Sequence, residues 1–114
     1  MKVKFCGFTR SEDLKAAVAL GVDAVGLVFY PPSPRYVDMV AARSLVADLP
    51  PFMNVVALVV NMAEDEFMRL SDTVPFDVVQ FHGDETAADC HRLANLTKKR
   101  WCKAIRVQES DTAV

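Results

Sequence analysis

The stretch that decides the fold is Val55-Val56-Ala57-Leu58-Val59-Val60, an unbroken apolar run. A run without polar alternation is typical of a strand covered on both faces, as in a buried parallel sheet. Asn61 and Glu64 follow it at the spacing of a capping box, which predicts a helix directly after the strand. A buried strand that leads into a helix is the repeating unit of α/β folds. We therefore expect this run to be a central strand of a parallel sheet.

The same unit recurs along the chain. Apolar runs predict strands at 2–6, 24–29, 54–60, 77–82 and 101–106. Capping residues predict the helices between them: Thr9 with Glu12, ending at Gly21; Asp38, ending before Pro50; Asn61 with Glu64; and Thr86 with Asp89. Strand starts lie roughly 22–30 residues apart, which is the length of one βα unit. The sequence predicts a strand–helix pair repeated four times and then a fifth strand.

Composition limits the class of protein. The chain has 114 residues, of which 52% are hydrophobic and 25% charged, and this is ordinary for one globular domain. A formal charge of -2 gives no basic footprint for nucleic acid or for an anionic membrane. No segment approaches the length of a membrane-spanning helix, and no signal peptide precedes the first strand. We expect a cytoplasmic protein in which Cys90 and Cys102 are reduced thiols.

Two architectures share this order of elements. A flavodoxin-like open sheet has five strands and would be complete at this length. A (β/α)8 barrel has eight units and generally about 200 residues or more, so this chain would form only part of one. The pattern of strands and helices alone does not separate the two.

Polar residues within the strands favour the barrel. Alternation places Lys4 with Cys6 on one face of the first strand, and Gln80 with His82 on one face of the fourth. In a barrel the other face meets the helices, so these side chains would point into the interior. In a doubly wound sheet helices cover both faces, and burying an unpaired amine or amide against them is costly.

Three residues at loop positions could carry chemistry. Cys6 and His82 each close a strand and precede a glycine, and ligands bind at the carboxyl ends of parallel strands. Arg35 ends the proline-rich loop 30–36, where its guanidinium could hold a carboxylate or a phosphate. Taken singly, each also fits a bland alternative: a small buried thiol, a hydrogen-bonded structural histidine, and a solvated arginine. No Gly-rich phosphate-loop motif and no metal-ligand spacing is present.

Three blocks together resemble the phosphoribosylanthranilate isomerase family. They are Lys4-Phe5-Cys6-Gly7-Phe8-Thr9-Arg10, the segment Gly26–Tyr36 with its Tyr30-Pro31-Pro32-Ser33-Pro34-Arg35 loop, and Val79-Gln80-Phe81-His82-Gly83-Asp84-Glu85. The resemblance covers essentially the whole chain and the first five of the family's eight βα units. It implies a parallel (β/α)8 TIM-barrel fold, with residues 1–114 as the N-terminal portion of one barrel domain, truncated after the fifth strand. It also implies that no cofactor or metal takes part.

The family acts in tryptophan biosynthesis. It converts N-(5-phosphoribosyl)anthranilate to 1-(2-carboxyphenylamino)-1-deoxyribulose 5-phosphate by an Amadori rearrangement. The resemblance implies that Cys6 is the general base, that Arg35 holds the anthranilate carboxylate, and that His82 lines the same rim. An ordinary thiol, with a pKa of about 8.5, is mostly protonated at neutral pH, so the site must favour the thiolate. We expect Lys4 and Gln80 to give electrostatic support, because they share the faces of Cys6 and His82.

The family's remaining groups have no match in the chain. Its general acid closes the sixth strand and its phosphate site follows the seventh and eighth, so the resemblance implies that the 114 residues alone are inactive. Loss of a general acid typically lowers the rate by about 10²–10⁴-fold. Two alternatives stay open: a non-catalytic half-barrel that self-associates through open strand edges, and a five-stranded flavodoxin-like binding domain.

Overall fold

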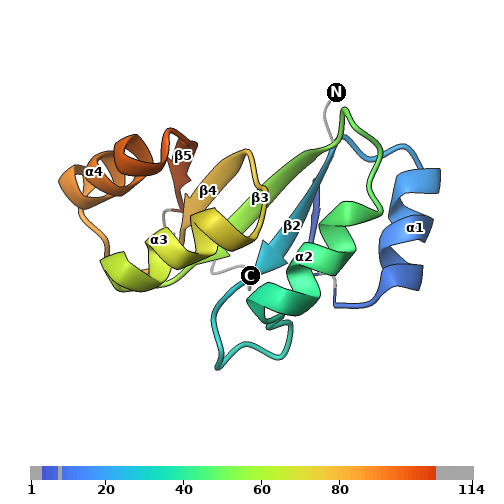
Figure 1. Cartoon of the computed structure of the whole chain (residues 1–114), viewed down its shortest axis with the longest axis horizontal. Coiled ribbons are helices and arrows are strands. Elements are labelled where there is room, and N and C mark those ends of the chain that lie inside the picture. The colour runs from blue at the N-terminus through green and yellow to red at the C-terminus, as the bar shows by residue number, and fades with distance from the viewer. Residues whose placement is uncertain (1–3, 8, 105–114) are drawn as a thin grey trace, which may run out of the picture.

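The computed structural model of the chain describes residues 4–7 and 9–104, with side chains from residue 9 onward. Five strands alternate with four helices, and Figure 1 shows them in chain order from blue to red. The strands are β1 (Lys4–Cys6), β2 (Ala24–Val28), β3 (Asn54–Val59), β4 (Val78–Phe81) and β5 (Arg100–Lys103). The helices are α1 (Ser11–Ala19), α2 (Met39–Ala47), α3 (Glu64–Thr73) and α4 (Ala87–Thr97). The predicted order is confirmed; parts of the outer strand predictions, 2–3 and 105–106, lie outside the described residues.

The strands form one parallel sheet in the order β1-β2-β3-β4-β5. A flavodoxin-like sheet would reverse direction and place its first strand inside the sheet. Sequential order is what a barrel requires, since each right-handed crossover adds the next strand on the same side. The flavodoxin-like alternative is therefore wrong, and the described residues have the architecture of part of an α/β barrel.

One face of the sheet carries the core. Neighbouring helices α2 and α3, and then α3 and α4, contact one another and form a layer along the sheet (Figure 1). Alternate strand residues point into that layer and are almost fully buried: Val25, Leu27, Val55, Ala57, Val59, Val79 and Phe81. Burying a valine, leucine or phenylalanine side chain contributes about 1.5–3 kcal/mol. Because this apolar layer occupies one face of the sheet, the strand residues between these positions point to the opposite face.

The face of the sheet opposite the helices carries Gln80 and its neighbours in the strand register. The register pairs Leu58 with Gln80 and Gln80 with Cys102, so these three positions lie in one row across the sheet. Leu58 is buried, Gln80 is half-buried and Cys102 is exposed. Gln80 thus lies on the face away from the helices, as the alternation predicts.

Two of the four predicted helix caps are confirmed. The side chain of Asp38 accepts from Ala41 N at 2.8 Å, and that of Thr86 accepts from Asp89 N at 3.1 Å. α1 is instead preceded by Arg10, whose guanidinium pairs with Glu12 at 3.1 Å, so the prediction for Thr9 is wrong. Ala63, not Asn61, precedes α3. Asn61 has a different structural role at the carboxyl edge of the sheet.

The two cysteines with described side chains are both unpaired. Cys90 is buried in α4, and burial raises the pKa of its thiol. Cys102 is exposed on β5. Neither thiol forms a disulfide within the described residues.

Phe67 of α3 is the centre of the aromatic packing that joins the helix layer to the sheet. Its ring lies 6.4 Å from that of Phe76 and 6.0 Å from that of Phe81, and it is fully buried. We predict that Phe67→Ala lowers the free energy of unfolding by about 3–5 kcal/mol, because it removes the side chain and leaves a cavity. Urea unfolding of the purified chain, followed by circular dichroism, measures the loss.

Phe52→Ala is the matched control, because Phe52 is 97% exposed before β3. We expect it to change stability by less than about 0.5 kcal/mol. If Phe67→Ala leaves too little folded protein, Phe67→Leu should show a smaller loss in the same direction. Equal effects at positions 52 and 67 would contradict the assigned core.

Candidate active site

The carboxyl ends of the strands bring three sequence-predicted segments to one edge of the sheet. β1 ends at Cys6, the 30–36 loop follows β2, and His82 comes directly after β4. Gly7 N donates to Gly26 O and His82 N donates to Val59 O, both at 2.9 Å, so the sheet pairing continues into both segments. We call Cys6, Gly7, the 30–36 loop and residues 82–85 the carboxyl rim.

The proline-rich loop folds back onto β2. Ser33 N donates to Tyr30 O at 2.9 Å, Tyr36 N donates to Ser33 O at 3.1 Å, and Val37 N donates to Val28 O at 3.0 Å. Ser33 Oγ accepts from the backbone N–H of Arg35 at 3.1 Å. The loop is therefore held by its own hydrogen bonds, and it presents Arg35 at the carboxyl rim.

Arg35 lies against Gly7, immediately after the predicted base. A methyl group at position 7 would lie 2.4 Å from Cδ of Arg35 and 3.3 Å from its Nε. Gly7 also has a φ of +86°, in the left-handed region that favours glycine. Glycine is thus needed at this position both for the backbone turn and for the approach of the guanidinium stem. The structure brings the Arg35 loop to the end of β1.

Lys4 and Cys6 are described as backbone positions of β1. They pair with Ala24 and Gly26, whereas Phe5 pairs with Val25 of the core face. This register assigns Lys4 and Cys6 to the rows of the sheet opposite the helix layer. The roles predicted for their side chains stay predictions.

His82 lies farther along the carboxyl rim. β2 and β3 separate β1 from β4 in the sheet, so Cys6 and His82 are three strand spacings apart, or roughly 14 Å along a flat sheet. His82 is half-buried. The structure thus places Arg35 beside the end of β1 and His82 across the rim from both.

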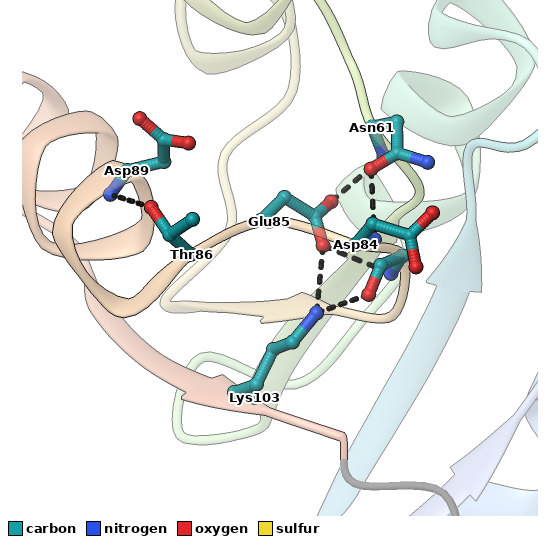
Figure 2. A network of polar contacts seen from close by, with 7 residues as sticks. Asn61, Asp84, Glu85, Thr86, Asp89 and Lys103 are labelled. Carbon is teal, nitrogen blue, oxygen red and sulfur yellow. Dashed lines mark hydrogen bonds and ion pairs between the residues drawn. The ribbon is translucent and has the colours of Figure 1, made fainter.

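A polar network that the sequence analysis missed surrounds the segment after His82 (Figure 2). The carboxylate of Glu85 accepts from Asn61 N at 2.7 Å, from Gly83 N at 2.9 Å and from Lys103 Nζ at 3.0 Å. Lys103 Nζ also donates to the carbonyl of Gly83, and Asn61 Oδ1 accepts from Asp84 N at 2.8 Å. We call Asn61, Glu85 and Lys103 the clasp. It joins the ends of β3, β4 and β5.

The charged pair of the clasp, Glu85 and Lys103, is partly shielded from solvent. The side chain of Glu85 is only 7% exposed and that of Lys103 is 27% exposed. Burial by itself raises the pKa of Glu85, but hydrogen bonds from Lys103 and from the backbone N–H groups of Asn61 and Gly83 outweigh it. The pKa of Glu85 is held below its ordinary value, so its carboxylate is ionised at neutral pH.

Three features mark the residues of the clasp and of the loop that it holds. Asn61 comes shortly after β3 and has a φ of +48°. Asparagine is among the few residues that favour this backbone region. Lys103 is a charged residue inside a short strand next to Trp101. Gly83 is a third feature, because a methyl group there would lie 2.7 Å from Asn61 Oδ1.

Residues 4–7 and 9–104 contain no group of His, Cys, Asp and Glu side chains that could hold a metal ion. In the same part of the chain, no helix has the length and apolar character needed to cross a bilayer. A cavity of about 380 Å³ lies at the opposite, amino-terminal ends of the strands, between Pro50, Phe76 and Lys99.

Comparison with known proteins agrees with the geometry. The model of the N-(5'-phosphoribosyl)anthranilate (PRA) isomerase family matches residues 3–113. The N-(5'-phosphoribosyl)anthranilate isomerase of Acinetobacter calcoaceticus is 48% identical over 107 residues, which are 94% of this chain and 50% of that protein. The enzyme of Pseudomonas fluorescens is 49% identical over 97% of this chain and 51% of its own length. The chain thus spans about half the length of these curated relatives.

Solved structures show the same relationship. Phosphoribosylanthranilate isomerase from Thermotoga maritima superposes with a TM-score of 0.89 at 38% identity, over 97% of this chain and 54% of that one. A phosphoribosylanthranilate isomerase in complex with reduced 1-(o-carboxyphenylamino)-1-deoxyribulose 5-phosphate also gives a TM-score of 0.89, over 97% and 57%. The fold is that of a parallel (β/α)8 barrel, of which the described residues form five strands. The chain belongs to the N-(5'-phosphoribosyl)anthranilate isomerase family.

Proposed function

We propose that this chain supplies the base-bearing half of a phosphoribosylanthranilate isomerase site. Its substrate is N-(5-phosphoribosyl)anthranilate, and the reaction is the Amadori rearrangement to 1-(2-carboxyphenylamino)-1-deoxyribulose 5-phosphate. The observation that carries the proposal is the approach of Arg35 to Gly7, which brings a carboxylate-binding group beside the end of β1, where Cys6 lies. Tryptophan biosynthesis and a cytoplasmic location belong to the same proposal and rest on family membership.

Each residue has a stated task. Cys6, as thiolate, removes the proton from C2 of the sugar once the ring has opened to the Schiff base. Arg35 holds the carboxylate of the anthranilate ring with its planar guanidinium, which suits paired hydrogen bonds to both oxygens. His82 bounds the aromatic portion from the other side of the rim. Lys4 and Gln80 raise the positive potential and the polarity on the same face of the sheet.

The 114 residues are proposed to need a complementary half for turnover. The chain spans about half the length of its relatives, and the resemblance implies that the family's general acid and phosphate site follow later strands of the barrel. Proton donation by a positioned acid is worth about 10²–10⁴-fold in rate. In this proposal, residues 1–114 form one side of the barrel domain.

Complementation tests the proposed function directly. We predict no measurable turnover of freshly generated substrate by the chain alone, and turnover after it is joined to the half of the Acinetobacter relative that it does not match. Cys6→Ser should lower kcat of the joined protein by about 10²–10⁴-fold, because it removes the base. The assay is the fluorescence of the anthranilate group. Turnover by the homogeneous chain alone, or an unaffected Cys6→Ser protein, would contradict the proposal.

Gly7 and Gly21 give a matched pair of substitutions. Both have positive φ, +86° and +85°, but only Gly7 contacts Arg35, whereas a methyl group at Gly21 meets nothing within 4 Å. Placing alanine in this conformation costs roughly 1–2 kcal/mol at either site. We predict that Gly7→Ala also raises KM of the joined protein by about 10- to 100-fold, as expected when a charged hydrogen bond is lost.

Gly21→Ala is the control for Gly7→Ala. Gly21→Ala should lower the unfolding midpoint and leave KM unchanged. Arg35→Ala should raise KM by a similar factor to Gly7→Ala. If Gly7→Ala left KM unchanged, the proposed role of Arg35 in binding the anthranilate carboxylate would be contradicted.

We also propose a second property, self-association. β1 and β5 each have a single neighbouring strand in the described sheet, and unpaired strand edges favour pairing with another chain. Light scattering of the 114-residue chain should therefore give a mass of two or more chains. A strictly monomeric mass at high concentration would contradict this proposal and leave the isomerase proposal untouched.

A further inference from the structure

The segment that follows β4 is fixed by an unusual number of contacts. His82 N is bonded to β3, Gly83 N to the carboxylate of Glu85, the Gly83 carbonyl to Lys103 Nζ, and Asp84 N to Asn61 Oδ1. Every backbone N–H from His82 to Asp84 thus has a partner, and Gly83 is also held through its carbonyl. The contacts come from three separate parts of the sequence.

The carboxylate of Glu85 is the centre of this arrangement. It receives two backbone N–H groups, one from the β3 end and one from the β4 end, as well as the ammonium of Lys103 on β5. Figure 2 shows Lys103 reaching from β5 toward both Glu85 and the backbone of the loop. The carboxylate is almost fully buried, so its lone pairs are satisfied by these protein groups with little contribution from solvent.

We propose that Glu85 is a positioning residue, which acts with Asn61 and Lys103 to hold His82 at the carboxyl rim in its substrate-binding position. The proposal rests on the proposed function, because that function gives His82 its task. Glu85 itself points into the clasp and does not touch substrate. Its effect on the reaction passes through the backbone of His82–Asp84. Misplacing a binding group by about 1 Å can cost roughly 10²-fold in rate.

A structural role alone would affect stability and not the reaction. A surface ion pair offers the comparison: Glu64 of α3 pairs with Arg92, and its side chain is 53% exposed. Glu64→Gln makes the same chemical change as Glu85→Gln, at an exposed ion pair outside the clasp. Asn61→Gly is a milder variant of the clasp, because glycine accepts the positive φ and only the bond to Asp84 N is lost.

The first measurement needs no turnover. Amide hydrogen exchange of the 114-residue chain should rise at residues 82–84 in Glu85→Gln, and at Asp84 in Asn61→Gly, with the core amides of β3 unchanged. Glu64→Gln should leave residues 82–84 as in the parent. If Glu85→Gln does not fold, Asn61→Gly and Lys103→Gln decide the result. Unchanged exchange at 82–84 in the folded variants would overturn the proposal.

The second measurement is a double-mutant cycle in the joined, active protein. Glu85→Gln should lower kcat/KM by about 10- to 100-fold in the parent background, and by less than about 3-fold when His82 is already alanine. Equal losses in both backgrounds would overturn the assignment to His82, and no loss in the parent would overturn any positioning role. A parent without activity, combined with the predicted change in exchange, would refute the proposed function and leave the clasp as the element that positions His82.

Discussion

Burial of alternate strand side chains beneath the helices is the constraint on which the rest of the structure depends. Val25, Val55 and Val79 are all at or below 3% exposure, and each belongs to the face that meets the helix layer. A slip of one residue in any strand would turn that strand's apolar side chains to the other face. The register is therefore fixed, and with it the level at which each strand ends. The register of the strands therefore places Cys6 and His82 at the same edge of the sheet.

Two local sets of contacts then fix the loops at the carboxyl rim, whose conformation the core packing does not determine. At one side of the carboxyl rim, the absence of a side chain on Gly7 lets Arg35 lie across the end of β1. At the other side, the buried carboxylate of Glu85 collects donors from the ends of three strands. Both sets of contacts use glycine where a methyl group would collide: Gly7 beneath Arg35 and Gly83 beneath Asn61. Preorganisation of this kind keeps binding groups in place before the substrate arrives.

Local signals in the sequence predict the order of strands and helices, but they do not predict the clasp. The apolar run at 55–60 and the caps Asp38 and Thr86 predict elements that the structure confirms, because each signal acts within a few residues. Asn61 was assigned to a helix cap by the same local rule, but its side chain is committed to Asp84, 23 residues away. The Glu85–Lys103 pair spans 18 residues and the Asn61–Glu85 bond spans 24, so neither shows in a local pattern. The approach of Arg35 to Gly7 likewise depends on how the loop folds back onto β2.

The central claim is that Gly7, Arg35 and His82 belong to one ligand-binding rim at the carboxyl ends of the strands. The most direct test is NMR titration of the isotope-labelled 114-residue chain with reduced 1-(o-carboxyphenylamino)-1-deoxyribulose 5-phosphate, the ligand of a structurally similar isomerase. The account predicts that amide shifts concentrate at Gly7, at Arg35 and in the His82–Gly83 segment, and that Arg35→Ala abolishes them. Amide shifts concentrated instead at Met53, Phe76 and Lys99, which line the cavity at the amino-terminal ends of the strands, would contradict it.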